Sequence, residues 1–200
     1  MKNIIFDLGQ VLVQVLFHDF RIKFAEAFNT NVDILAEETV DGAHIDFMVG
    51  KISPDEFHRM TCERFHHFIS LHDFKKLWLG MLGGKVEGTD EIVAGLRRKG
   101  HHLHLLSNVD QWHFEFCQNN FPVLKHFEKK FVSYQMKLKK PDQEIYEQVV
   151  SELKASADEC LFIDDKQENV VAAQTVGMDA IQFSDAFQLK TVLNRKGIIF

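Results

Sequence analysis

The sequence predicts an α/β protein, with a doubly wound parallel sheet of five strands and a small helical cap inserted after the first strand. Short β-rich runs end at five places, and from the second run onward amphipathic helical stretches separate them. Such alternation is typical of a parallel sheet with helices on both faces. The five predicted strand ends are Asp7, Ser107, the vicinity of Ser133, Asp164 and the vicinity of Phe183.

One long segment breaks this alternation. Residues 16–84 are helical in pattern and rich in Phe and His. Ser53-Pro54-Asp55-Glu56 is a strong helix start, with Ser as N-cap, Pro at the first position and Glu completing a capping box. We therefore expect an α/β core of residues 1–15 and 85–200, and a helical cap of residues 16–84. Gly9, Gly80, Gly83 and Gly84 are candidate hinges between the two parts.

Three helices of the core can be predicted individually. The first runs from Gly88 to Arg98, with apolar residues on one face, basic residues in its last turn and a glycine stop. The second opens at Pro141 and continues through Glu152, and the third begins near Gln167 and ends at Gly177.

Composition excludes several classes of protein. The 200 residues are 46% hydrophobic, which is enough for one substantial core. The formal charge of -6 argues against nonspecific nucleic-acid binding, which needs a basic surface. Three widely separated cysteines indicate neither a disulfide framework nor a zinc site. Without a secretion signal or an apolar run near about 20 residues, we expect a cytoplasmic protein with no membrane partner.

Polar side chains follow several predicted strands, at the edge of a doubly wound sheet where ligands bind. The first strand ends on Asp7, and a later buried strand ends on the pair Asp164-Asp165. Carboxylates are the hard oxygen ligands that Mg²⁺ prefers. Ser107-Asn108 follows a third apolar run, and Lys140 precedes Pro141.

This order of Asp7, Ser107, Lys140 and Asp164-Asp165 resembles the haloacid dehalogenase-like hydrolase superfamily, whose members are mostly Mg²⁺-dependent phosphatases that work through an aspartyl-phosphate. The resemblance implies that the first and fourth strands of the sheet are adjacent, so that the early and late acids face one another. It covers essentially the whole chain.

The resemblance also implies a role for each site residue. Asp7 would be the nucleophile and a metal ligand, and Asp165 a further metal ligand. Ser107, aided by the backbone N–H of Asn108, would bind the phosphate, and Lys140 would neutralise it. Asp164 and Asn169 would lie in the shell around the metal ligands.

Gly9 departs from the family pattern, which usually places a second Asp two residues after the nucleophile as the general acid. The Gly9 carbonyl can still bind the metal, but no side chain can pass a proton to the leaving oxygen. The opening resembles that of bacterial sugar-phosphate phosphatases, such as those acting on glucose 1-phosphate. We therefore expect a small phosphorylated metabolite as substrate, with a preference for good leaving groups.

Two further departures concern the cap and the lysine loop. Met48 stands where that subgroup can have Glu, and Lys137 stands where a Gly is usual. An apolar Met weakens the case for sugar recognition by that route. Lys137 would reshape the entrance without removing a catalytic group.

Two other functions remain open. A 2-haloacid dehalogenase would also lack the second Asp, but it needs no metal, and the Asp164-Asp165 pair favours a bound cation. A weakly active relative that binds a phosphorylated metabolite or a protein partner would account for Gly9, although simple binding requires no nucleophile. The sequence leaves a monomer and a homodimer equally open.

Overall fold

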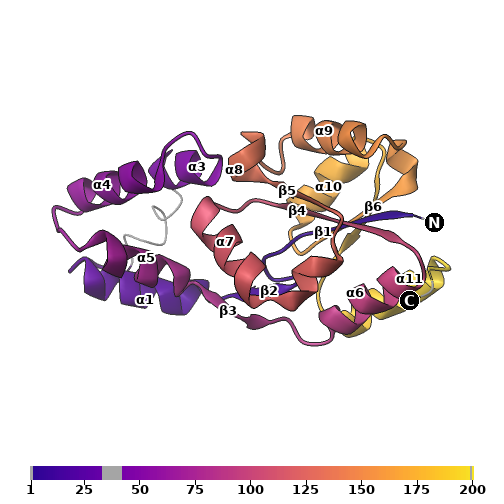
Figure 1. Cartoon of the computed structure of the whole chain (residues 1–200), viewed down its shortest axis with the longest axis horizontal. Coiled ribbons are helices and arrows are strands. Elements are labelled where there is room, and N and C mark those ends of the chain that lie inside the picture. The colour runs from indigo at the N-terminus through magenta and orange to yellow at the C-terminus, as the bar shows by residue number, and fades with distance from the viewer. Residues whose placement is uncertain (1, 33–41, 199) are drawn as a thin grey trace.

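The sheet that the sequence predicts is present in the computed structural model, which describes residues 2–32, 42–198 and 200. Five parallel strands lie in the order β5-β4-β1-β6-β7 (Figure 1). Their bounds are β1 (Asn3–Phe6), β4 (His102–Ser107), β5 (Lys129–Val132), β6 (Cys160–Asp164) and β7 (Asp179–Gln182). β1 therefore lies in the middle of the sheet, between β4 and β6, and the predicted adjacency of the first and fourth core strands is confirmed.

The strand register brings the polar strand ends to one edge. Phe6 is opposite Leu105 of β4 and opposite Ile163 of β6. The next residue along β1 is Asp7, whose backbone N–H donates to the Ile163 carbonyl at 2.8 Å. Asp7 therefore emerges beside the ends of both neighbouring strands.

Alternate residues of the strands pack on opposite faces of the sheet, as pleated backbone requires. Ile4 and Phe6 join a cluster with α6 (Thr89–Arg98), α7 (Gln111–Asn120) and α11 (Ala186–Arg195). Ile5 joins a second cluster, on the other face, with α9 (Gln143–Leu153) and α10 (Gln167–Thr175). Burial of apolar residues on both faces holds the central strands rigidly, and with them the site that they carry.

Two of the predicted core helices agree with the structure, and the start of the third is wrong. α6 follows Gly88, which has a φ of 79°, and α10 is followed by Gly177, which has a φ of 90°. The helix predicted to open at Pro141 begins two residues later, at Gln143. Pro141 instead lies in a turn closed by a hydrogen bond from the Asp142 N–H to the Lys139 carbonyl. That turn carries Lys140 to the sheet edge.

A group of helices between β2 (Val13–Val15) and β3 (Leu82–Lys85) forms a separate layer, which we call the helical cap (Figure 1). Its members are α1 (Phe17–Ala27), α3 (Gly42–Met48), α4 (Pro54–Arg64) and α5 (Leu71–Leu79). They share a hydrophobic cluster of their own, built around Phe20, Phe24 and Phe28 of the first helix segment. The capping box of Ser53 and Glu56 is present. Residues 33–41 of the predicted cap lie outside the described residues.

The antiparallel ribbon of β2 and β3 joins the cap to the core and is absent from the prediction. Gly83 and Gly84, predicted as hinges, are part of β3. A Cβ atom on Gly83 would lie 3.0 Å from the Cβ of Gln14. The small residue therefore permits the close approach of the two strands, and the hinge role stays a prediction.

Shorter elements complete the chain: α8 (Ser133–Met136) and the 3₁₀ helices η1 (Pro122–His126) and η2 (Ala157–Glu159). Within the described residues, no helix is both long and apolar enough to cross a membrane.

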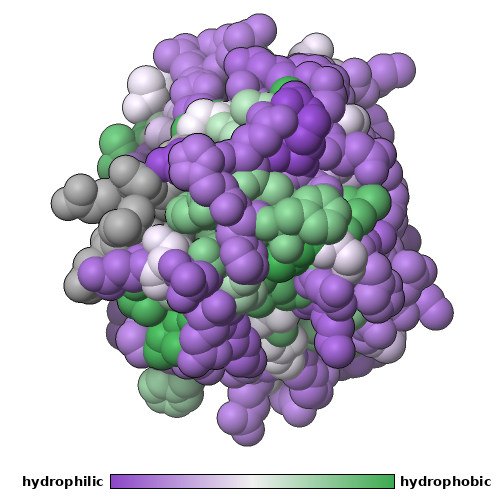
Figure 2. All heavy atoms as spheres, turned by 90° about the vertical axis from the view of Figure 1, so that its left-hand side faces the viewer, coloured by the Kyte–Doolittle hydropathy of each residue, from purple (hydrophilic) through white to green (hydrophobic). Residues whose placement is uncertain are grey.

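The end of the molecule formed by the cap shows apolar side chains between hydrophilic ones (Figure 2).

Candidate active site

Three carboxylates meet at the carboxyl edge of the sheet. Asp7 follows β1, Asp164 ends β6, and Asp165 is the next residue. Each offers one oxygen atom, and these three atoms lie within 4.8 Å of one another, which no other group of His, Cys, Asp or Glu achieves among the described residues. Oxygen ligands at this spacing fit a hard divalent cation such as Mg²⁺.

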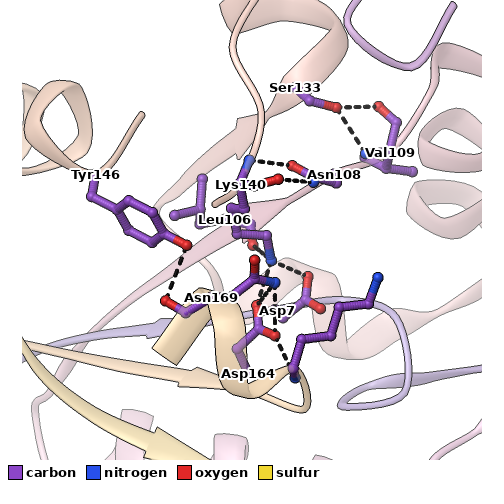
Figure 3. Close-up of polar contacts among 10 residues, drawn as sticks. Asp7, Leu106, Asn108, Val109, Ser133, Lys140, Tyr146, Asp164 and Asn169 are labelled. Atoms are coloured by element: carbon purple, nitrogen blue, oxygen red, sulfur yellow. Dashed lines mark hydrogen bonds and ion pairs between the residues drawn. The ribbon is translucent and has the colours of Figure 1, made fainter. Parts of the chain in front are cut away.

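Lys140 supplies the positive charge of the cluster (Figure 3). Its ammonium nitrogen lies 2.8 Å from Asp7 Oδ1 and 2.6 Å from Asp164 Oδ2, and it donates to the Leu106 carbonyl at 3.0 Å. The lysine is 3% exposed. Burial alone favours the neutral amine, but attraction to the two carboxylates outweighs it and holds the pKa of Lys140 above its ordinary value of 10.5. Lys140 is therefore a fixed ammonium group.

Asp164 is held rigidly. It is completely buried, and it accepts hydrogen bonds from the Asn169 amide at 3.0 Å and from the Lys166 backbone N–H at 2.8 Å. The carbonyl of Asn169 in turn accepts from the Tyr146 hydroxyl at 3.1 Å (Figure 3). The network orients Asp164 toward Lys140, while Asp165 is only partly buried and faces the cavity.

Asn108 positions Lys140. Its side-chain amide donates to the Lys140 carbonyl at 2.7 Å, and its side-chain oxygen accepts from the Lys140 N–H at 2.8 Å. The sequence does not predict this reciprocal pair, since the family resemblance implies only that the backbone N–H of Asn108 binds the phosphate. Ser107, at the end of β4, is 3% exposed and lines the same cavity as Asp7.

The acids carry more negative charge than Lys140 neutralises. Burial raises the pKa of Asp7 to about 6; attraction to Lys140 opposes this shift, and repulsion from Asp164 adds to it. Burial and repulsion from Asp164 also raise the pKa of Asp165. Both raised pKa values mean that the negatively charged carboxylates are unfavourable in this environment. The carboxylate oxygens of this edge could therefore accept an additional cation.

Gly9 lies in the loop after Asp7 and lines the same cavity. It forms a bridge with Val13, and a Cβ atom added to it would lie 3.3 Å from Val15 Cγ2. Its backbone therefore lies close to the ribbon that leads to the cap, and no side chain extends from this position toward a leaving group.

The cavity above the acids has a volume of about 670 Å³ and lies between the sheet edge and the cap. Its base contains all the predicted site residues: Asp7, Gly9, Ser107, Asn108, Lys140, Asp165 and Asn169, with Asp164 buried directly behind. Residues of β2, α3 and β3 form the opposite wall. The size suits a small organic ligand.

Sequence reasoning missed a buried pair at the side of this cavity. His113 Nδ1 lies 2.7 Å from Asp110 Oδ2, and His113 Nε2 lies 2.9 Å from the Trp78 carbonyl. Both ring nitrogens face acceptors, so the ring satisfies both contacts only as a doubly protonated imidazolium. Burial alone lowers the pKa of His113, but the Asp110 carboxylate outweighs it and the pKa is raised. The only sequence signal is an N-cap Asp followed three residues later by His.

This pair connects the core to the cap. Asp110 Oδ2 also accepts from the Trp78 indole N–H at 3.0 Å, and Trp78 belongs to α5. On the other side of the cavity, the Ser133 hydroxyl donates to the Met48 carbonyl at 2.7 Å, and Lys137 Nζ donates to the Gly50 carbonyl. Lys137 has a φ of 62°, which explains why Gly is usual there.

Comparisons with known proteins agree with the fold. The profile of the haloacid dehalogenase-like hydrolase family matches residues 4–183. The chain is 28% identical to a D-ribitol-5-phosphate phosphatase of Bacteroides thetaiotaomicron, over 91% of each protein. It is 26% identical to a sesquiterpene phosphatase of Aspergillus oryzae, over 92% of this chain and 91% of that protein.

A solved structure extends the similarity to three dimensions. A family enzyme of Bacteroides thetaiotaomicron, in complex with magnesium and inorganic phosphate, superposes with a TM-score of 0.83 at 28% identity, covering 94% of this chain and 98% of that one. The doubly wound parallel sheet and the family match identify the chain as a hydrolase with a Rossmann-like α/β fold. The chain belongs to the haloacid dehalogenase-like hydrolase family.

Proposed function

We propose that the protein is a Mg²⁺-dependent phosphatase that hydrolyses a small phosphorylated metabolite through an aspartyl-phosphate on Asp7. The main support is that Asp7, Asp164 and Asp165 lie close together, beside the buried ammonium group of Lys140. An anionic cluster with one fixed cation suits a site that accepts a metal ion and a phosphate together.

The proposed reaction has two steps. Asp7 attacks phosphorus, the P–O bond to the organic group breaks, and the leaving oxygen takes a proton from water. Water then attacks the phosphorus of the acyl phosphate, which frees the Asp7 carboxylate and releases inorganic phosphate. Lys140 neutralises the phosphoryl oxygens throughout, and Ser107 donates its hydroxyl to one of them.

Asp7, Asp165 and the carbonyl of Gly9 would hold Mg²⁺, with Asp164 and Asn169 supporting them from behind. The bound ion would supply further positive charge to the phosphoryl oxygens. The raised pKa values of Asp7 and Asp165 support this assignment, because they show that the positive charge near these two carboxylates does not balance their burial and their repulsion from Asp164.

A dehalogenase is the alternative within the same fold. It would use the same strand-end carboxylate on a carbon–halogen bond, without a metal. The cluster of three acids disfavours this alternative, because the single ammonium group of Lys140 contacts Asp7 and Asp164 and cannot neutralise all three carboxylates. A weakly active binding protein is disfavoured by the position of Asp7 beside Lys140, which simple binding does not require.

The named substrates of the relatives support phosphate ester hydrolysis and differ in their organic parts. One relative is named for a sugar-alcohol phosphate and the other for a sesquiterpene. The sugar-phosphate preference predicted from the opening motif therefore stays a prediction. Cys62, Cys117 and Cys160 are buried free thiols, which supports our further proposal of a cytoplasmic location.

The function is tested by phosphate release. Purified protein is incubated with acetyl phosphate, whose leaving group needs no general acid, in Mg²⁺ and then in EDTA. We expect release in Mg²⁺, loss in EDTA and recovery on adding excess Mg²⁺. Activity toward 2-haloacids that persists in EDTA, together with no phosphate release, would establish the dehalogenase instead.

A further inference from the structure

The wall of the cavity that faces the acids is apolar. Side chains of β2, the start of α1, α3, the turn before β3 and β3 itself contribute to it: Val15, Phe17, Ile45, Met48, Met81 and Leu82. Among the described residues of that wall, His44 is the one with a polar side chain. Its ring packs edge-on against Trp78, with ring centroids 5.1 Å apart. Phe17 is 38% exposed, so part of this apolar surface remains open to a ligand.

The charged residues Lys139, Lys166 and Glu168 line the cavity next to Lys140 and Asp165 of its base. At the sides, three polar residues, His113, Asp110 and Gln10, are already paired within the protein. Both ring nitrogens of His113 contact Asp110 and the Trp78 carbonyl. Asp110 Oδ1 also accepts a hydrogen bond from the backbone N–H of His113 at 3.0 Å. The Gln10 amide donates to the Val15 carbonyl at 3.0 Å and accepts from the Val15 N–H. These groups would have to break internal hydrogen bonds to bind a ligand hydroxyl.

The cavity thus has a charged end and an apolar end. Asp7, Ser107, Lys140 and Asp165 occupy the base, where the phosphoryl group would lie. A polyol chain leading from that base toward the cap would lose its hydrogen bonds to water and find apolar carbon in their place. A hydrocarbon chain or ring would lose contact with water at the same surface, which is favourable.

We propose that the organic part of the substrate is apolar, an alkyl, isoprenoid or aromatic group, and that Val15, Phe17, Ile45, Met48 and Leu82 bind it. This inference rests on the proposed phosphatase function and adds the substrate class. It differs from the sugar-phosphate preference, which would require polar partners for several hydroxyl groups.

The test compares pentyl phosphate with D-ribitol 5-phosphate in Mg²⁺. Both are five-carbon esters of a primary alcohol, so the missing side chain at Gly9 affects them alike, and they differ in their hydroxyl groups. We expect kcat/KM for pentyl phosphate to be higher by about tenfold or more, since several hydroxyls would be desolvated without partners. In the series from propyl to heptyl phosphate, kcat/KM should rise about fourfold per methylene group.

Acetyl phosphate, which has almost no organic part, separates the two proposals. If it is hydrolysed while the alkyl series is flat, or while ribitol 5-phosphate equals or exceeds pentyl phosphate, the apolar assignment is overturned and the phosphatase function stands. If neither acetyl phosphate nor any ester is hydrolysed, both proposals fail.

A matched pair of variants locates the selectivity. Met48→Gln places an amide of similar length in the apolar wall, and Met60→Gln makes the same substitution on α4, away from the cavity. We expect Met48→Gln to lower the ratio of kcat/KM for pentyl over ribitol phosphate by about tenfold. Met60→Gln should keep the wild-type ratio. Equal ratios in the two variants would show that the α3 wall does not contact the organic group.

Discussion

The ammonium nitrogen of Lys140 lies 2.8 Å from the carboxylate of Asp7, in a buried ion pair at the centre of the sheet edge. The same nitrogen lies 2.6 Å from Asp164. One cation thus joins the loop after β1 to the end of β6, which means that the fold and the candidate site depend on the same contact.

Replacing Lys140 with Met should therefore cost both stability and activity. Removal of one partner from a buried ion pair typically costs about 3–5 kcal/mol, because the remaining charge is left uncompensated. We expect a loss of that size in the free energy of unfolding, measured by urea denaturation, and a loss of phosphate release. Lys125→Met, at an exposed position in η1, serves as the control. Equal stabilities of the two variants would contradict a structural role for the ion pair.

Mg²⁺ should stabilise the folded protein through Asp165. A ligand at about 100 times its dissociation constant adds about 2.7 kcal/mol to the free energy of unfolding. Thermal denaturation should therefore show a higher Tm in Mg²⁺ for the wild type, and a much smaller increase for Asp165→Asn. Asp158→Asn, which removes an exposed acid before β6, should respond as the wild type does. A full Mg²⁺ response in Asp165→Asn would remove that residue from the metal site.

The His113–Asp110 pair should make stability depend on pH. The pKa of His113 is raised above 6.5, so its contribution is fully present below pH 6.5 and is lost as pH rises through the raised value. The pKa of Asp110 is lowered below 3.8, so its contribution is present above pH 3.8 and is lost as pH falls through the lowered value. The pair therefore stabilises the fold fully between pH 3.8 and 6.5.

His113→Leu measures this contribution. At pH 6 we expect it to lower the free energy of unfolding by about 3–5 kcal/mol, and the difference from the wild type should shrink at alkaline pH. His72→Leu, at an exposed position on α5, should change stability little at any pH. A wild-type-to-variant difference that stays constant from pH 6 to alkaline pH would show that His113 is neutral in the folded protein.

Gly9→Asp should add the general acid that the site lacks. The position does not require a glycine conformation, and only Val15 must shift slightly to admit the new Cβ atom. A positioned acid typically contributes about 10²–10⁴-fold, so the gain in kcat should be large for pentyl phosphate and small for acetyl phosphate. Gly9→Asn has the same size but no proton to give. Similar rates for the Asp and Asn variants would mean that leaving-group protonation does not limit the reaction.

The sheet and the acids at its carboxyl edge could be predicted because their signals are local. The runs Asn3–Phe6 and Cys160–Asp164 are apolar and each leads to an acid, so strand, strand end and polar group can be read from a few adjacent residues. The family resemblance then supplied the strand order, which places Asp7 beside Asp164 and which no local pattern contains.

The features that were missed depend on contacts between distant segments. The strand Val13–Val15 is three residues long with a polar centre, and its partner contains two glycines, so neither has a clear strand pattern. The contact of His113 with the Trp78 carbonyl requires α5 and α7 to be packed together. The start of α9 was misplaced because Pro141 takes part in a turn that the Asn108 side chain holds, and that partner lies on another strand end.

Trapping the covalent intermediate tests the central claim most directly. The protein is mixed with acetyl phosphate and Mg²⁺, quenched in acid within the first turnovers and digested, and the peptides are examined by mass spectrometry. The account predicts one phosphoryl group on the peptide that contains Asp7, labile to hydroxylamine and absent from Asp7→Asn, whose kcat should fall at least about a thousandfold. Undiminished turnover by Asp7→Asn, or a phosphoryl group on another residue, would contradict it.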